Sequence, residues 1–333
     1  MLEMLEGKKF MYSDIKIAKN IRDDTALRES FNSLAEKTFG LNFEGWYQNG
    51  YWKDNYIPYS AVRDGRVIAN VSVNPMTFSE NGKLHNYIQL GTVMTDPAFR
   101  SQGLSRLLMD AVEKDWKDRT EAFYLFANDT VLDFYPRFGF RRAQEYRFFA
   151  PLPVRCRPAQ DKGSSDKSLP GKSAPDSQNA VPVSMADPQN RAALERAVSS
   201  CVPQGSFDMV QNPGLILFSA SQFLAENVFF LPAQNAYVIA EAEGDTLLLD
   251  AILAPRPLDP MEAAEVLLSG PAGSLLCDDP GALSRLECGF APADTRGFEI
   301  RTLDNDDDAL FVKGRLTDTL FHGQKRFPVL SHA

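Results

Sequence analysis

The segment that follows Thr95 combines residue types that suit an anionic ligand. A strand is predicted to end near Thr95, Asp96-Pro97 turns the chain, and Arg100–Ser105 (RSQGLS) opens an amphipathic helix. The first turn of a helix has N–H groups without intrahelical partners, and this end of the helix dipole is positive. A phosphate placed there satisfies both, and Gly103 has no Cβ to keep it from the backbone. The spacing therefore predicts a phosphate site.

Three side chains strengthen this interpretation, and two better-known phosphate motifs are absent. Arg100 and Arg106 bring positive charge to the helix start, and Ser105 adds a hydroxyl donor. A P-loop would need Lys-Ser/Thr after the glycine, and a dinucleotide fingerprint would need a glycine triplet. Arg-x-x-Gly-x-Ser by itself also fits an ordinary helix start, so the neighbouring segments must decide.

A second segment lies downstream, beyond a predicted apolar strand at Ala122–Ala127. It runs from Asn128 to Phe140 and reads NDTVLDFYPRFGF. Together the two segments resemble the GCN5-related N-acetyltransferase (GNAT) superfamily, in which a strand–Arg/Gln-x-x-Gly-x-Gly/Ala–helix signature precedes an Asn…Phe-Tyr…Gly-Phe segment. The resemblance covers about residues 12–150. Ser105 departs from the usual Gly or Ala but is also small.

The resemblance implies acetyl-CoA as the acyl donor, no metal, and specific roles for individual residues. Backbone groups at the strand end would pair with the pantetheine arm, the loop would hold the pyrophosphate with Arg100 bounding it, and Asn128 would contact the cofactor where two strands splay apart. Tyr135 would protonate the departing CoA thiolate. The implied binding residues are Val93, Met94, Thr95, Arg100, Ser101, Gln102, Gly103, Leu104, Ser105, Arg106 and Asn128. Two alternatives remain open, because Asn128 could cap a helix and Tyr135 could be a core aromatic beside Phe134 and Phe138.

The acceptor side is less well defined. An amine must lose a proton before it attacks a thioester, so a base within hydrogen-bond reach is expected. Glu44, Glu80 and His85 are candidates, although each also fits a solvated surface position. The segment after the first helix is crowded with aromatic rings, which could hold a cation or form a small hydrophobic subcore. These rings are Trp46, Tyr47, Tyr51, Trp52, Tyr56 and Tyr59.

The first half alternates between strands and helices, which predicts an α/β or α+β domain with a mixed, GNAT-type sheet flanked by helices. Asp64-Gly65 predicts a tight hairpin turn, and Leu104, Leu108 and Val112 lie on one apolar stripe. The predicted strands are Ile15–Ile21, Tyr59–Arg63, Val67–Val73, Tyr87–Thr95, Ala122–Ala127 and Phe138–Phe149, and the predicted helices are Thr25–Thr38, Gly103–Trp116 and Thr130–Tyr135, the last stopped by Pro136.

Residues 156–185 are rich in Ser, Pro, Lys, Asp and Gly and have little to bury, which is typical of a flexible linker. We therefore expect a catalytic domain at 1–153, a linker at 154–186 and a second domain at 187–333. The catalytic domain should bind acetyl-CoA without the second domain. The second half predicts helices at Pro188–Val198, Leu215–Leu224, Met261–Leu268 and Gly281–Leu286, and strands at Asn227–Leu231, Tyr237–Ala242, Thr246–Leu253, Ser274–Cys277 and Leu310–Gly314.

This order echoes the first half, and Cys288-Gly-Phe290 would match Phe138-Gly-Phe140. Leu258-Asp-Pro260 stands where the phosphate loop would be. The second half thus resembles a diverged GNAT-like domain that has lost the acetyl-CoA loop.

Composition narrows the remaining classes. The first 150 residues carry 20 basic and 20 acidic side chains, whereas residues 151–333 carry 15 and 24, so neither half has the basic surface of a nucleic-acid-binding protein. No apolar stretch is long enough to span a membrane, and no signal sequence is recognisable, so we expect a cytoplasmic protein. Four unpaired cysteines and three histidines predict neither a disulfide framework nor a metal site.

The sequence as a whole predicts an acetyl-CoA-dependent N-acetyltransferase that acts on an amine of a small molecule or peptide, with oligomerisation left open. Two alternatives remain. One is a non-catalytic acyl-CoA-binding regulatory protein, and the other is an enzyme of the same fold that uses another acyl-CoA or another nucleophile.

Overall fold

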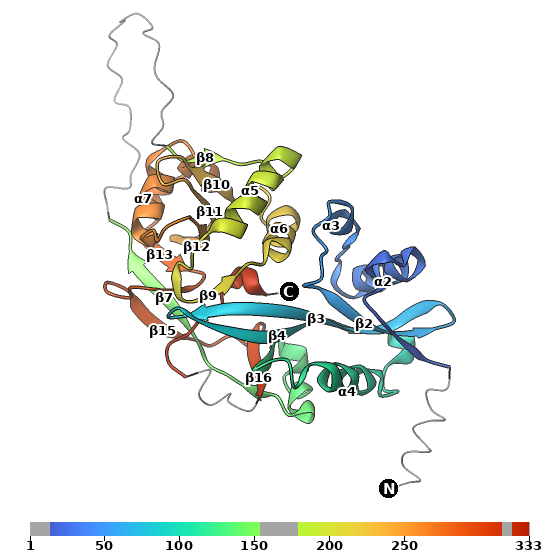
Figure 1. The fold of residues 1–333 in the computed structure, drawn as a ribbon. Coiled ribbons are helices and arrows are strands. Elements are labelled where there is room, and N and C mark those ends of the chain that lie inside the picture. The colour runs from blue at the N-terminus through green and yellow to red at the C-terminus, as the bar shows by residue number, and fades with distance from the viewer. Residues whose placement is uncertain (1–13, 154–178, 315–321, 333) are drawn as a thin grey trace, which may run out of the picture.

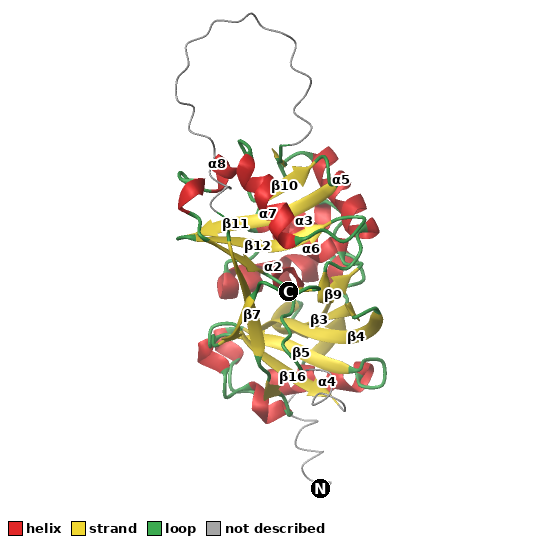
Figure 2. Cartoon of the chain, turned by 90° about the vertical axis from the view of Figure 1, so that its left-hand side faces the viewer, coloured by secondary structure: helices red, strands yellow, loops and turns green. Residues whose placement is uncertain are grey.

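The computed structural model describes residues 14–153, 179–314 and 322–332. The chain builds two β-sheets with helices on their faces, one above the other in Figure 1 and Figure 2. This confirms the predicted mixed α/β class. No helix among the described residues is long and apolar enough to cross a membrane.

The first sheet has nine strands. Along its main path the order is β1-β2-β3-β4-β5-β16-β6, with β9 on the far part of β3 and β14 beside β9. All neighbours are antiparallel except β4 and β5. The strands are β1 (Lys16–Lys19), β2 (Ile57–Arg63), β3 (Arg66–Glu80), β4 (Lys83–Thr95), β5 (Ala122–Ala127), β6 (Arg141–Arg142), β9 (Gly205–Val210), β14 (Ala291–Pro292) and β16 (Ala309–Gly314).

Helices cover both faces of this sheet. On one face lie α2 (Thr25–Phe39) and α3 (Glu44–Gln48), and on the other lies α4 (Leu104–Trp116) (Figure 1). The predicted apolar stripe of α4 is buried against the sheet, with Leu104, Leu108 and Val112 at most 2% exposed. The Asp24 side chain accepts from the Leu27 N–H and caps α2, which fixes where that helix begins.

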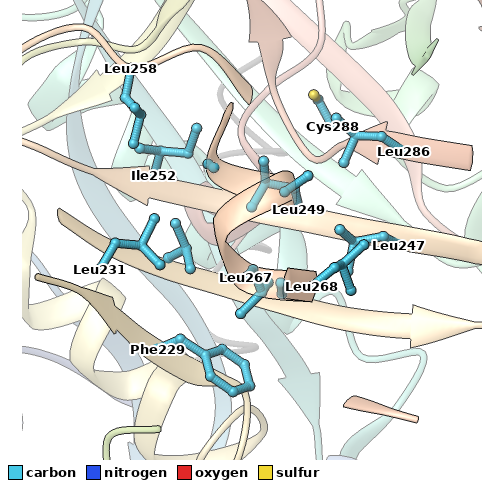
Figure 3. Packing of buried hydrophobic residues seen from close by; sticks show 14 of the residues in the cluster. Phe229, Leu231, Leu247, Leu249, Ile252, Leu258, Leu267, Leu268, Leu286 and Cys288 are labelled. Carbon is cyan, nitrogen blue, oxygen red and sulfur yellow. The ribbon is translucent and has the colours of Figure 1, made fainter. Parts of the chain in front are cut away.

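The second sheet has seven strands in the order β15-β7-β13-β12-β11-β10-β8. Its core is a cluster of Leu, Ile, Phe and Ala side chains between the sheet and α7 (Figure 3). The strands are β7 (Glu145–Pro151), β8 (Val181–Pro182), β10 (Val228–Leu231), β11 (Ala236–Glu243), β12 (Thr246–Leu253), β13 (Arg285–Cys288) and β15 (Glu299–Leu303), and the helices are α5 (Pro188–Ser200), α6 (Pro213–Gln222), α7 (Pro260–Ser269) and α8 (Gly273–Leu276).

The two halves exchange strands. The first half contributes β7 to the second sheet, where it pairs with β13 and β15. The second half contributes β16, which pairs with all six residues of β5, and β9, which pairs with the end of β3. Each sheet therefore contains strands from both sides of residue 153. A boundary at this residue would separate hydrogen-bonded strands in both sheets, so the halves are not independent structural units.

Both sheets repeat one local pattern. In the first, β3 and β4 are antiparallel, α4 follows, and β5 lies parallel to β4. In the second, β11 and β12 are antiparallel, α7 follows, and β13 lies parallel to β12. The Asp259 side chain caps α7 and Pro260 is its first residue, so Leu258-Asp-Pro260 is an ordinary helix start. The shared pattern supports the duplication that the sequence predicts without establishing it.

Several sequence-based predictions of local structure were wrong. Ser274–Cys277 is not a strand, because α8 occupies Gly273–Leu276. The single strand expected at Phe138–Phe149 is two strands in different sheets, β6 and β7. Thr130–Tyr135 is not an α-helix but part of two 3₁₀ turns, Asp129–Val131 and Tyr135–Phe138. Pro136 lies inside the second turn, where its missing N–H is not needed.

The polar segment that was expected to link two domains lies mainly at residues 154–178, outside the described part of the chain. Its end is described, and there Val181–Pro182 forms β8 and pairs with β10. The strands β9, β13, β14 and β15 were not predicted. The helix expected at Gly281–Leu286 is instead a 3₁₀ turn at Pro280–Ala282, followed by the start of β13.

Candidate active site

The site begins where β4 and β5 separate. They pair only from Tyr87 to Gln89 on β4, and no described strand adds to this edge of β4 from there to Thr95. A register shift against β3 between Asn70 and Ser72 marks an extra residue on β4 beside Thr92, whose φ of 47° bends the strand. The bulge and the lost pairing open a wedge between two parallel strands.

A cavity of about 950 Å³ occupies this wedge. Its volume lies at the upper end of the range for small-molecule sites. Of the predicted binding residues, the lining includes Val93, Met94, Thr95, Arg100, Ser101, Gly103, Leu104, Ser105, Arg106 and Asn128, together with Tyr135. The structure thus brings eleven of the twelve predicted site residues to one cavity, the exception being Gln102.

The loop before α4 has the backbone that the sequence predicts for close approach of a ligand. Gly103 is the residue before the helix and has a φ of 78°, a left-handed conformation that favours glycine. Ser101 also has a positive φ, of 61°. Gln102 turns its amide toward the carbonyl oxygen of Ala98, 3.4 Å away, which explains why its side chain does not line the cavity. The N–H groups of the first turn of α4 remain available to an anion.

Three guanidinium groups surround this end of the cavity. Arg100, Arg106 and Arg137 all line it, and within the described ranges none of them forms an ion pair with a carboxylate. The Arg106 guanidinium donates to the Arg137 carbonyl oxygen at 3.3 Å and lies over the Phe138 ring. Unneutralised positive charge beside a helix N-terminus is what a pyrophosphate requires. Sequence reasoning missed Arg137, although it lies within the second motif.

Asn128 both caps a turn and lines the cavity, so the two interpretations offered for it are compatible. Its Oδ1 accepts from the Thr130 N–H at 3.2 Å and from the Thr130 hydroxyl at 2.6 Å, so it caps the 3₁₀ turn. Asn128 also lines the cavity at the end of β5, just past the point where the strands separate. Its amide nitrogen is not used by the cap.

Tyr135 is also both packed and accessible to the cavity. It is 6% exposed and contacts the rings of Phe134, Phe140 and Phe311. Burial raises the pKa of its phenol to about 12. Within the described residues its hydroxyl has no hydrogen-bond partner, so the proton of a neutral phenol is not committed to another group of the protein.

The other end of the cavity is aromatic. Phe43, Trp46 and Tyr56 contribute from the first half, and Leu215 and Phe218 of α6 contribute from the second. Phe43 and Phe218 stack with ring centroids 5.2 Å apart and planes at 2°. The remaining rings of the aromatic segment do not line the cavity. These are Tyr47, Tyr51, Trp52 and Tyr59, of which the first three pack in or against a subcore with Phe31 and Leu34.

None of the three candidate bases lies at this cavity. Glu44 binds Arg28 at 2.9 Å, which lowers the pKa of that carboxyl group, and Glu80 binds Lys325 at 2.6 Å. His85 is 3% exposed and pairs with Glu121 at 2.9 Å, so the expectation of a solvated histidine was wrong. Over the described residues no group of three His, Cys, Asp or Glu side chains could hold a metal ion.

A different histidine lines the cavity. His332 stacks on Phe126 of β5 with centroids 3.5 Å apart, and its Nδ1 lies 3.1 Å from Oδ2 of Asp308. Both side chains belong to the cavity lining. No sequence signal could have found this site, because Phe126 and His332 come from opposite halves of the chain and meet only through the fold.

Comparison with known proteins agrees with this geometry. A family model described as an acetyltransferase (GNAT) domain matches residues 25–143. No curated protein matches the chain.

Solved structures with related folds cover 90% of this chain and 72% of their own. They include a probable N-acyltransferase from Enterococcus faecalis V583 (12% identity, TM-score 0.53), a GCN5-related N-acetyltransferase from Kribbella flavida (15%, 0.51) and Eis1 from Mycobacterium abscessus (15%, 0.50). At this identity they show the fold alone, while the family match extends over both motifs and the cavity loop. This chain is therefore an acyltransferase in which residues 25–143 form an acetyltransferase domain of the GNAT family.

Proposed function

We propose that this chain transfers an acetyl group from acetyl-CoA to an amine of a small molecule or peptide by direct attack on the thioester. The observation that carries the proposal is the juxtaposition of two features in one cavity. The open edge of β4 can pair with an extended amide-containing arm, and the loop at Arg100–Arg106 can hold the pyrophosphate at the end of that arm.

The residues at the wedge have complementary tasks in this proposal. Backbone groups of Val93, Met94 and Thr95 on the open edge of β4 align the pantetheine arm. Arg100, Arg106 and Arg137 neutralise the pyrophosphate, and Asn128 orients the donor with the amide nitrogen that its cap leaves unused. Tyr135 donates its proton to sulfur as the carbon–sulfur bond breaks, and its raised pKa keeps that proton in place at neutral pH.

The acceptor binds at the aromatic end, where both halves of the chain contribute. This arrangement gives the second half a function in catalysis even though its own α7 begins without a phosphate loop. The competing interpretation is a protein that binds acyl-CoA for regulation and has no useful turnover. A longer acyl donor or a nucleophile other than an amine is a further candidate.

Thiol release from acetyl-CoA, measured on the full chain across a panel of amines, tests the proposal. Amine-dependent release that follows amine concentration supports transfer. Acetyl-CoA binding measured by calorimetry without amine-dependent release would instead support the regulatory protein. Parallel assays with butyryl-CoA and octanoyl-CoA identify the donor, and faster turnover with either would replace acetyl-CoA in the proposal.

A further inference from the structure

We propose that His332 accepts the proton of the acceptor amine and that Asp308 positions its imidazole ring. This inference rests on the proposed function, since it names the base of that reaction. It assigns catalysis to a residue far from both sequence motifs. This residue reaches the cavity because the last described segment of the chain lies between the two sheets (Figure 1).

The ring of His332 is fixed in orientation. One face stacks on Phe126, and Nδ1 lies 3.1 Å from the Asp308 carboxylate. A carboxylate beside Nδ1 favours the tautomer that carries its proton there and leaves Nε2 as an acceptor. Nε2 is buried and has no hydrogen-bond partner in the described residues. Leaving such an atom unpaired costs about 1–3 kcal/mol. Displacement of the atoms that cover Nε2 would let an ammonium group in the cavity supply the missing partner.

The position of the ring on the sheet suits an acceptor base. Phe126 lies on β5, two residues before Asn128. The side chains of β5 alternate, so that Leu125 and Ala127 pack with α4 while Tyr124 and Phe126 face the opposite side. His332 therefore approaches the wedge from the face that bears Leu215 and Phe218. The base and the aromatic end of the cavity thus belong to the same side of the sheet.

The charged groups around the ring are few. Among the described residues, Asp308 pairs with Nδ1, and Glu145 of β7 is a second carboxyl group that interacts with the imidazole. Desolvation raises the pKa of Glu145, which itself accepts from the Phe327 N–H. Arg326 also acts on Glu145 but is bound to Glu287 at 2.8 Å. Asp308 is thus the principal partner of His332.

The reaction balances with one proton released. His332 takes a proton from the ammonium group, and the freed nitrogen lone pair forms a bond to the thioester carbon. The carbon–sulfur bond breaks with its electron pair on sulfur, which takes the proton of Tyr135. The nitrogen, now bearing one proton too many for an amide, returns that proton to the phenolate. His332 passes its proton to solvent before the next cycle.

Substitution of His332 by Gln tests the assignment when two acceptors are compared. A primary alkylamine is protonated at pH 7, whereas an arylamine such as aniline already carries a free lone pair. We expect H332Q to lower kcat/KM for the alkylamine by about 10²–10⁴-fold, the usual contribution of general base catalysis, and to affect the arylamine far less. Acetyl-CoA affinity should not change. H322Q replaces another described histidine, which is exposed and does not line the cavity, and should leave both activities unchanged.

The Asp308 variant gives the second readout. The side-chain amide of D308N can donate to Nδ1 and reverse the tautomer, so kcat/KM should fall for the alkylamine and far less for the arylamine. A merely structural Asp308 would lower both rates equally. H332N serves as the second variant if H332Q does not fold, as judged by thermal unfolding.

The outcomes separate the base from the function. Equal losses with both amines, or wild-type rates in a folded H332Q or H332N, would overturn the base alone. A wild-type protein that transferred acetyl to no amine would overturn the proposed function, and the base with it.

Discussion

The indole nitrogen of Trp46 donates a hydrogen bond to the carbonyl oxygen of Gly214 at 2.8 Å and joins α3 to α6 across 168 residues of sequence. Gly214 has no room for a side chain, since a Cβ would lie 2.6 Å from the Tyr51 carbonyl oxygen. This close approach brings α6 against the aromatic segment of the first half. The acceptor end of the cavity is consequently made by both halves.

The exchange of strands predicts that the halves fold only together. A fragment ending at Pro153 would leave β5 without β16 and would expose β7, whose partners are all in the second half. We expect this fragment to be insoluble or unfolded when expressed alone. Co-expression with a fragment that starts at Asn179 should give a soluble complex that binds acetyl-CoA.

Circular dichroism and co-purification of tagged fragments measure this outcome. The expectation from the sequence was different, namely that the first half binds acetyl-CoA by itself. A monomeric, cooperatively folding 1–153 fragment with full affinity would restore that view and would show that β16 and β7 are dispensable.

Gly103 gives a direct test of the phosphate loop. Gly103→Glu would place a carboxylate where the pyrophosphate is proposed to bind, and like-charge juxtaposition costs several kcal/mol. Acetyl-CoA affinity by calorimetry should fall by about 100-fold or more. Gly82→Glu is the matched control, because Gly82 has a similar φ of 84° in an exposed turn with open space around it. Both variants carry about 1–2 kcal/mol of backbone strain, so equal loss of binding in both would refute the loop assignment.

The local elements of the site could be predicted from the sequence because their signals are local. The stripe of α4, the start of that helix at Gly103 and the apolar strand Ala122–Ala127 depend on residues only a few positions apart. The loop and the wedge follow from these elements and their order. The mixed α/β class and the GNAT-type domain were predicted on the same basis. The two sheets confirm the class, and a GNAT family model matches residues 25–143.

The remaining features depend on contacts between distant segments, which periodicity does not report. From its sequence, β7 is predicted to be the last strand of the first sheet. In the structure it belongs to the second sheet, where it pairs with β13 and β15. His332 has no motif around it and becomes notable only through Phe126 and Asp308. The short run Ser274–Cys277 is apolar enough for a strand, and only packing against α7 shows it to be helical.

Arg137 should matter for donors that carry a pyrophosphate and for no others. Arg137→Gln removes one of three cations at the cavity, and a charge-assisted hydrogen bond contributes about 1.5–3 kcal/mol. We expect acetyl-CoA affinity to fall about tenfold or more, while kcat/KM for S-acetyl-N-acetylcysteamine, which lacks the pyrophosphate, stays the same. Arg119→Gln, at an arginine that lies over Trp116 away from the cavity, is the control. A parallel loss with the truncated donor would assign Arg137 to the fold.

Tyr135→Phe distinguishes catalysis from packing at one position. If the phenol protonates the CoA thiolate, kcat should fall by up to about 10²–10⁴-fold with acetyl-CoA affinity retained, because the ring still packs against Phe134 and Phe140. If Tyr135 is only a core residue, Tyr135→Phe should be neutral and Tyr135→Ala should lower the free energy of unfolding by about 3–5 kcal/mol. Single-turnover rates measure the chemical step, and wild-type rates in the Phe variant would return Tyr135 to the core.

The raised pKa of Tyr135 also predicts the alkaline side of the pH profile. A phenol with a pKa of about 12 remains protonated through pH 10, so its ionisation should not reduce kcat below that pH. The free energy of unfolding depends on pH in the same direction, because the folded state holds the phenolic proton more tightly than the unfolded state. The contribution of this proton to stability is lost only as the pH rises from about 10 toward 12. An alkaline limb below pH 9 that disappears in Tyr135→Phe would contradict this environment for the phenol.

Phe218 tests whether the second half contributes to acceptor binding. Its ring stacks on Phe43 at the aromatic end. Among the described residues that line the cavity, Asp308 is the one with an acidic side chain, and it is already paired with His332. Amines that bear an aromatic ring should therefore be better acceptors than polyamines, whose second and third charges would find no carboxylate. Phe218→Ala should raise KM for the aromatic amine about tenfold, since burial of such a ring contributes about 1.5–3 kcal/mol, and leave KM for acetyl-CoA unchanged.

The control is Phe223→Ala, because the Phe223 ring is exposed just beyond the same helix and does not line the cavity. Thermal unfolding of both variants checks the fold. A polyamine preferred over every aromatic amine, with KM unaffected by Phe218→Ala, would place the acceptor elsewhere and limit α6 to an interface.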